Sequence, residues 1–185
     1  MAGMKQMLFG AVIAGAVMIG TTLSSLAADL PLKAFFGVWS GSGLARNEES
    51  DYFGLTIRDL DVTIQGNGKG FTLGWTTVLR EGGDPKNAKV KRKSESLNFQ
   101  PTARPGIYAP SESSRDPVGG GRTIWARVKD QTITVNTLSV LDDGGFELQR
   151  YDRTLTDLGL ELDFISVRDH GIVRRVTGRL TKQAN

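Results

Sequence analysis

Apolar and polar residues alternate at every second position in several runs along the chain, which is the spacing of a β-strand with one buried face. Phe71, Leu73 and Trp75, for example, alternate with Thr and Gly. Segments rich in Gly, Asp and Asn separate the runs at the intervals of a β-meander, and helical spacing is scarce after the first 27 residues. The pattern predicts strands near residues 35–46, 53–65, 69–80, 88–99, 121–129, 131–141, 145–154, 159–168 and 171–181.

One of these runs changes phase. In residues 55–64 the apolar positions 55 and 57 are out of step with positions 60, 62 and 64. A one-residue β-bulge at Arg58-Asp59 would restore a single buried face, and two short strands separated by a kink would explain the same pattern. Because a bent strand favours a closing sheet, we predict an all-β fold, an antiparallel up-and-down β-barrel of about eight or nine strands.

The connection over residues 100–120 is long, irregular and rich in proline and serine. Such a segment is usually a functional flap or a disordered excursion. Ile107 and Tyr108 are its apolar pair, so we expect residues 106–108 to contact the barrel and residues 111–117 to be disordered. The sequence shows no internal repeat and no second domain.

The first 27 residues have the three parts of a cleavable signal peptide. Lys5 supplies a positive charge, residues 7–20 are uncharged and apolar, and residues 25–27 (Ser-Leu-Ala) end in small residues. We predict cleavage after Ala27, one β-barrel domain over residues 28–185, a periplasmic location and no membrane span in the mature protein. A retained membrane anchor is the alternative, because the apolar stretch with its flanks approaches the length of a bilayer span.

Net charge and cysteine content further restrict the classes of protein that the sequence fits. The leader carries one base and no acid, so the 23 basic and 20 acidic residues of the chain leave a net charge of +2 in the mature protein. This near balance argues against a nucleic-acid partner, which calls for a clustered basic face. The chain has no cysteine, so no disulfide stabilises it.

One local cluster of bases stands out from this balance. It could bind an anionic component of the cell envelope or a protein. It could equally protect an edge strand from pairing with another chain. Its members are Lys86, Lys89, Lys91, Arg92 and Lys93.

Signals of catalysis are weak. His170, the single histidine, falls in a predicted turn, and the chain contains neither a Cys nucleophile nor a G-x-S-x-G motif. Asp59 and Asp61 read as solvated strand acids, and residues 142–145 (Asp-Asp-Gly-Gly) as a hairpin rather than a calcium loop. We predict that the protein is not an enzyme and uses no cofactor and no metal ion.

Large aromatic residues on several predicted strands could line a binding cavity. The orientation of Trp125 is ambiguous, because Ile124 and Ala126 lie on the opposite face of its strand. The candidate ligand contacts are Trp75, Tyr108, Trp125, Tyr151 and Phe164.

The tripeptide Gly37-Val38-Trp39 on the first predicted strand resembles the G-x-W signature of the calycin superfamily, which contains lipocalins, avidin-like proteins and fatty-acid-binding proteins. In that superfamily the Trp packs inside one end of the barrel, under a basic residue from the last strand. The resemblance implies that Trp39 takes this place and that Arg174, on the same face as Leu180, is the basic residue. It also implies a barrel that binds a small molecule.

Two functions from different classes fit the sequence. The first is a calycin-like periplasmic carrier that holds a small hydrophobic or amphipathic molecule in its barrel. The second is an interaction protein with a filled core, similar to the small periplasmic barrel inhibitors of secreted metalloproteases. An outer-membrane barrel is disfavoured, because aromatic residues make up only 8% of the chain and residues 182–185 lack a terminal aromatic strand.

Overall fold

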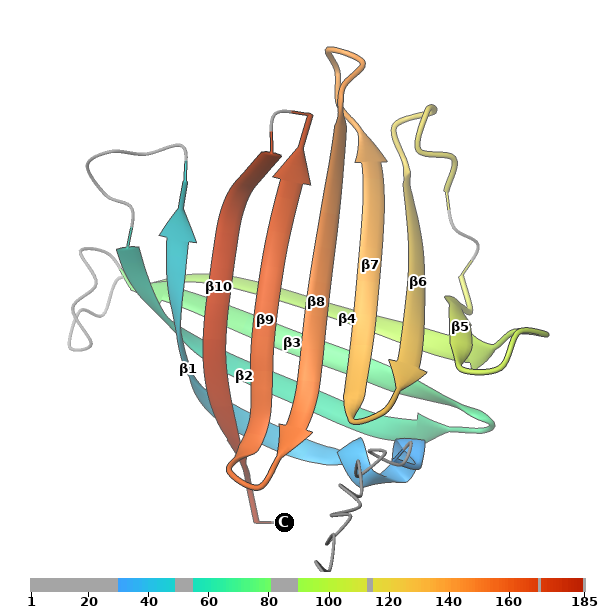
Figure 1. The fold of residues 1–185 in the computed structure, drawn as a ribbon, viewed down its shortest axis with the longest axis vertical. Coiled ribbons are helices and arrows are strands. Elements are labelled where there is room, and N and C mark those ends of the chain that lie inside the picture. The colour runs from blue at the N-terminus through green and yellow to red at the C-terminus, as the bar shows by residue number, and fades with distance from the viewer. Residues whose placement is uncertain (1–29, 49–54, 81–89, 113–114, 170, 185) are drawn as a thin grey trace, which may run out of the picture.

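The computed structural model describes residues 30–48, 55–80, 90–112, 115–169 and 171–184 (Figure 1). The predicted signal peptide and its cleavage site lie outside the described residues, as do residues 113–114 of the segment expected to be disordered. The elements are a 3-10 helix η1 (Leu32–Phe35) and the strands β1 (Gly37–Asn47), β2 (Leu55–Asn67), β3 (Gly70–Arg80), β4 (Val90–Pro101), β5 (Ile107–Pro110), β6 (Arg122–Lys129), β7 (Thr132–Val140), β8 (Phe146–Thr156), β9 (Gly159–Arg168) and β10 (Gly171–Lys182).

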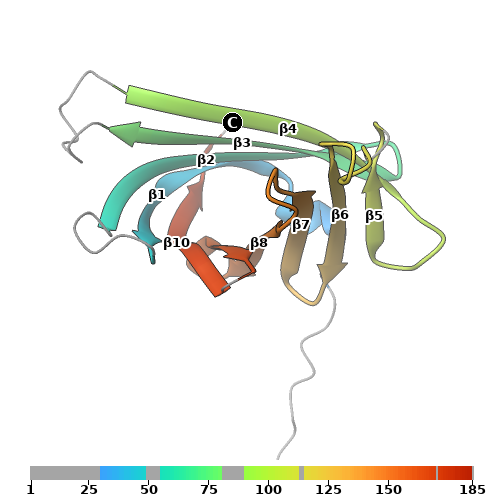
Figure 2. The same cartoon turned by 90° about the horizontal axis from the view of Figure 1, so that it is seen from above.

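In the described residues the strands form a closed antiparallel barrel whose order follows the chain, and β10 pairs with β1 to close it. Viewed from above, β2, β3 and β4 run along one side and β8 to β10 along the facing side (Figure 2). The all-β antiparallel barrel predicted from the alternation is therefore confirmed.

The strand count was wrong, since the barrel has ten strands rather than eight or nine. The additional strand is β5, which lies inside the segment interpreted as a flap or an excursion. It has only four residues and ends at a proline, so it carries too little alternation to be recognised. Residues 107 and 108 do contact the barrel, as expected, through pairing with β6.

The bulge predicted at Arg58-Asp59 was also wrong. The pairing of β2 with β1 and with β3 runs without a register shift through these residues, so β2 is one continuous strand. Leu55 and Ile57 lie on the outer face, with 60% and 54% of their surface exposed. The apparent phase change came from these exposed apolar side chains, and the continuous register turns Arg58 toward the lumen. The register shift that the structure does contain is in β10, between Ile172 and Arg174.

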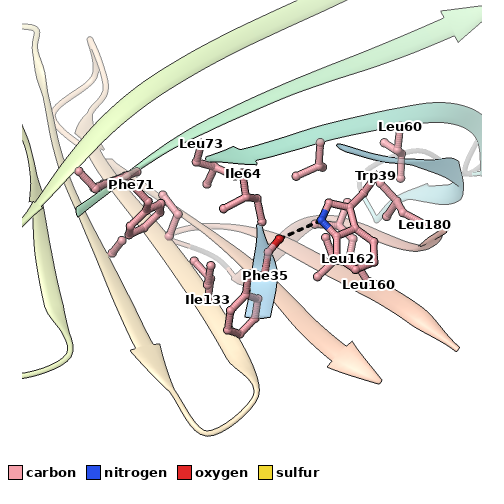
Figure 3. Packing of buried hydrophobic residues seen from close by; sticks show 14 of the residues in the cluster. Phe35, Trp39, Leu60, Ile64, Phe71, Leu73, Ile133, Leu160, Leu162 and Leu180 are labelled. Atoms are coloured by element: carbon pink, nitrogen blue, oxygen red, sulfur yellow. Dashed lines mark hydrogen bonds between the residues drawn. The ribbon is translucent and has the colours of Figure 1, made fainter. Parts of the chain in front are cut away.

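Apolar side chains fill the end of the barrel at which β1 begins, which is the lower end in Figure 1. Helix η1 lies against this end and its Phe35 is fully buried (Figures 1 and 3). Trp39 Nε1 donates a hydrogen bond to Phe35 O at 3.0 Å, which ties β1 to the helix. Phe71 from β3 and Phe99 from β4 stack with ring centroids 5.1 Å apart in the same core. This packing fixes one end of the barrel as solid core.

The basic residue beside Trp39 is not the one that the calycin resemblance implied. Lys182 is the direct cross-strand partner of Trp39, and its Nζ lies 5.4 Å from the centroid of the indole ring. Arg174 pairs with Asn47 instead, eight residues along β10. At about 3.3 Å per residue, that distance carries Arg174 to the opposite end of the barrel.

Candidate functional site

A cavity of about 420 Å³ occupies the barrel toward the strand ends remote from η1. Its walls come from β2, β3 and β4 on one side and from β8, β9 and β10 on the other. The volume falls within the range of small-molecule sites. The lining residues are Arg58, Leu60, Trp75, Thr77, Leu79, Lys91, Lys93, Gln149, Tyr151, Phe164, Arg174 and Val176.

Three aromatic rings form the floor of this cavity, and we call Trp75, Tyr151 and Phe164 the aromatic floor. The ring centroids of Trp75 and Tyr151 are 5.7 Å apart, and those of Tyr151 and Phe164 are 4.4 Å apart. The rings thus form a continuous layer from β3 across to β8 and β9. The Tyr151 hydroxyl donates a hydrogen bond to Gln149 Oε1 at 3.3 Å. Burial raises the pKa of Tyr151, so its hydroxyl stays protonated and the side chain is neutral at physiological pH. The floor is an apolar contact surface with one hydroxyl.

The wall above the floor is cationic. Arg58, Leu79 and Lys91 lie side by side across β2, β3 and β4, and Lys93 lies one row nearer the floor. On the facing side Arg174 is paired with Ser166 of β9. No carboxylate is among the described residues that line the cavity. The lining therefore attracts an anion.

Arg58 and Arg174 lie close enough for their positive charges to repel each other. Burial lowers the pKa of Arg58, and the positive charge of Arg174 lowers it further. The Nε atom of Arg58 is shielded from solvent and has no hydrogen-bond acceptor among the described residues. A bound anion would both relieve the repulsion between these arginines and accept from an unsatisfied donor.

A fifth cation lies on the core side of the aromatic floor. Arg153 of β8 is only 1% exposed, and its guanidinium carbon lies 5.3 Å from the ring centroid of Trp75 and 5.4 Å from that of Tyr151. Its Nε and Nη1 atoms have no acceptor among the described residues. Burial lowers the pKa of Arg153 to about 10, so it still carries its charge at neutral pH. In this low-dielectric setting the charge adds to the positive potential over the floor.

The carboxylates near the cavity are already paired. Glu147 accepts a hydrogen bond from Ser166 Oγ at 2.6 Å and lies 3.8 Å from Arg168 Nε. Glu95, the cross-strand neighbour of Trp75, forms an ion pair with Arg122. These pairings leave the positive charge of the cavity wall largely uncompensated.

The structure brings together Trp75, Tyr151 and Phe164 from the aromatic set expected to contact a ligand. Tyr108 lies apart from them in the filled core, with its ring centroid 5.2 Å from that of Phe71, so it is not part of a flap over the cavity. Trp125 lies on the outer face, because its neighbours Ile124 and Ala126 point into the core.

Several functional residues were missed or assigned another role. Arg58 was assigned to a bulge, although it is in phase with the buried positions 60, 62 and 64. Arg153 was not considered, although it is in phase with Tyr151. Lys91 and Lys93 from the basic cluster line the cavity, whereas Lys86 and Lys89 lie outside the described residues. Each arginine lies an even number of positions from inward-facing residues of its own strand, and this spacing is the signal that could have found both of them.

Within the described part of the chain, no helix combines the length and the hydropathy needed to cross a bilayer. No protein-family model matches the chain, and no curated protein sequence matches it. Among solved structures, the chain is similar to an S-type phycobiliprotein lyase, CPES, from Guillardia theta, with 11% sequence identity and a TM-score of 0.44. That alignment covers 83% of this chain and 91% of the lyase chain.

Proposed function

We propose that the protein is an exported binding barrel that holds one small amphipathic molecule, with an anionic group, in the cavity above the aromatic floor. The observation that carries this proposal is the lining itself. Arg58, Lys91, Lys93 and Arg174 contribute positive charge, the floor contributes aromatic surface, and no described lining residue contributes a carboxylate.

The apolar part and the anionic group of such a ligand would be stabilised by different interactions. Its apolar part would cover the rings of Trp75, Tyr151 and Phe164, at about 25 cal/mol for each Å² removed from water. Its anionic group would lie between Arg58 and Arg174, where charge-assisted hydrogen bonds are stronger than neutral ones. A neutral ligand of the same shape would leave the repulsion between these arginines in place.

The alternative is an interaction or inhibitor-type protein whose barrel takes no small ligand. The apolar core at the η1 end is what a filled barrel requires. The cavity at the other end supports the carrier, because a filled barrel would place large apolar side chains where Arg58, Thr77 and Lys93 stand. Export to the periplasm forms part of the proposal through the leader sequence.

A matched pair of fluorescent probes tests the proposal. Anilinonaphthalene sulfonate and phenylnaphthylamine share an aromatic body and differ in the sulfonate. We expect the sulfonate probe to bind the folded protein with a stoichiometry near one and at least about tenfold more tightly than the neutral probe. Arg58→Gln should reduce this preference, while Arg150→Gln, on the outer face of β8, should leave it unchanged.

The outcomes separate the alternatives. Equal affinity for the two probes would remove the anionic group from the proposal. Binding of neither probe, together with native mass spectra of periplasm-purified protein that show no co-purified small molecule, would favour the interaction protein.

A further inference from the structure

A small cavity of about 140 Å³ adjoins the ligand cavity at the end of the barrel remote from η1, and we call it the head-group cavity. Arg58, Leu79 and Arg174 line both cavities, so the two meet at these side chains. A water molecule takes up about 30 Å³ in the liquid, so the head-group cavity has room for roughly four of them. It can therefore hold a compact polar group but not the body of a ligand.

The head-group cavity exists because β1 has a small inward-facing residue at this level. Ala45 is 2% exposed and pairs with Thr56 of β2 on one side and with Val176 of β10 on the other. Arg58 is the next inward position on β2 after Thr56, and Arg174 is the next inward position on β10 before Val176. The space over Ala45 is thus bordered by an arginine from each flanking strand.

The described residues that line the head-group cavity offer hydrogen-bond donors and no carboxylate. Arg58 Nε is shielded from solvent and has no acceptor, and Thr56 adds a hydroxyl. Arg46 also lines the cavity, but its side chain is 64% exposed and its Nε lies 3.8 Å from Glu48 Oε2. The two inner arginines therefore supply most of the uncompensated positive charge, and a group with more than one negative charge balances it best.

We propose that the head-group cavity binds the phosphate of a phosphate monoester, whose apolar body then covers the aromatic floor. The inference rests on the proposed function and names its ligand class. A phosphate monoester carries close to two negative charges at pH 7, because its second pKa is about 6. Its three terminal oxygens can accept from both guanidinium groups and from the Thr56 hydroxyl. A carboxylate or a sulfate ester carries one charge and leaves one of the two arginines uncompensated.

Two naphthyl esters test the class of head group. 1-Naphthyl phosphate and 1-naphthyl sulfate share the aromatic body and the ester oxygen, and they differ by one negative charge at pH 8. In competition with anilinonaphthalene sulfonate at this pH, the phosphate ester should bind at least about tenfold more tightly than the sulfate ester. Inorganic phosphate has no apolar body to cover the floor, so it should compete at least about a hundredfold less well than the phosphate ester.

Acidification tests whether the second charge is recognised. At pH 5 the phosphate ester is mostly a monoanion, so its advantage over the sulfate ester should fall to about twofold. The sulfate ester keeps one charge throughout and reports any titration of the protein itself. Among the described residues, the carboxylates Glu48, Glu95 and Glu147 near the cavities are in ion pairs. The ionisable groups that line the two cavities are Arg46, Arg58, Lys91, Lys93, Tyr151 and Arg174.

Substitutions locate the phosphate in the head-group cavity. Arg174→Gln should reduce the phosphate advantage at pH 8 to below about threefold. Arg175→Gln, at the adjacent position on the outer face of β10, is the matched control and should leave it unchanged. Ala45→Val keeps every charge but fills the cavity, so it should also remove the advantage and leave the affinity for phenylnaphthylamine unchanged. Thr56→Val, which is similar in shape, should weaken the phosphate ester about threefold and provides a second variant if Ala45→Val does not fold.

The possible results separate the inference from the proposed function. If the native protein binds the two esters equally at pH 8, or if the phosphate advantage persists at pH 5, the phosphate class is wrong, while tighter binding of the sulfonate probe than of the neutral probe keeps the proposed function. A phosphate advantage that survives Arg174→Gln and either Ala45→Val or Thr56→Val would place the phosphate elsewhere and also overturn the inference. Inorganic phosphate that competes as well as the ester would show that no apolar body is recognised, against the inference. A native protein that binds no probe and no ester overturns the proposed function.

Discussion

Lys182 lies over the indole ring of Trp39, and it can do so because the residue two positions before the Trp is glycine. A Cβ atom built on Gly37 would lie 2.5 Å from Lys182 Cε, and Gly37 has a φ of +148°, a conformation that other residues rarely adopt. Gly37, Trp39 and Lys182 therefore form one structural unit at the filled end of the barrel. The unit gives the Gly-x-Trp spacing in this chain a steric reason.

The first prediction separates the two basic residues of β10. Trp39→Ala should lower the free energy of unfolding by about 3–5 kcal/mol, because it leaves a cavity beside Phe35. Lys182→Ala should lower it by about 0.5–1 kcal/mol through loss of the cation–π contact. Arg174→Ala should not lower it, because this arginine stands near Arg58, a like charge. Urea unfolding curves measure all three, and a larger loss for Arg174→Ala than for Lys182→Ala would contradict the assignment.

The second prediction concerns Arg153. Arg153→Met should raise the free energy of unfolding by about 1–3 kcal/mol, because it replaces a buried, incompletely hydrogen-bonded charge with an apolar side chain of similar length. The same variant should bind the sulfonate probe more weakly. Arg150→Met, on the outer face of the same strand, is the control and should change neither property appreciably. A destabilised Arg153→Met would mean that the guanidinium contributes more to packing than its burial costs.

The third prediction follows from the pKa of Arg153, which burial lowers from its ordinary value to about 10. Below pH 10 the folded and unfolded chains both hold this proton, so Arg153 adds no pH dependence there. Above about pH 10, until the unfolded guanidinium loses its proton as well, the unfolded chain holds more protons than the folded one, and the contribution of Arg153 to the free energy of unfolding rises with pH. The difference in stability between the native protein and Arg153→Met should therefore shrink over this range. Unfolding curves at several alkaline pH values check it, and a difference that stays constant would contradict the lowered pKa.

The fourth prediction compares two tryptophans. Trp75→Ala should weaken binding of the sulfonate probe at least about tenfold, because it removes one ring of the aromatic floor. Trp125→Ala should leave binding unchanged, since Trp125 lies on the outer face. Fluorescence titration of each folded variant measures the effect. Equal affinities for the two variants would place the probe outside the cavity.

The fifth prediction concerns export. The leader has the charge, the apolar length and the small residues that signal peptidase requires, so protein recovered from the periplasm should begin at Ala28. N-terminal sequencing gives the answer directly. Recovery in the inner-membrane fraction with Met1 intact would favour the retained anchor.

The alternation of apolar and polar residues determined by itself where the long strands lie, because side chains on a strand point to opposite faces and one face here must be buried. It also brought Trp75, Tyr151 and Phe164 into the candidate set, since each is in phase with buried neighbours. These are local properties, which neighbouring residues along the chain suffice to specify.

Three other features were decided only by the tertiary structure. Strand β5 is too short to show a period, and it forms because β4 and β6 supply its partners. The inward orientation of Arg58 depends on the register of β2 against β1 and β3 rather than on the hydrophobicity of Leu55 and Ile57. The pairing of Lys182 rather than Arg174 with Trp39 depends on how β10 closes onto β1, since closure sets which end of the last strand meets the start of the first. Pairings between residues this far apart in the chain are settled by packing the whole barrel, because the pattern within one strand is the same whichever residue of another strand lies opposite.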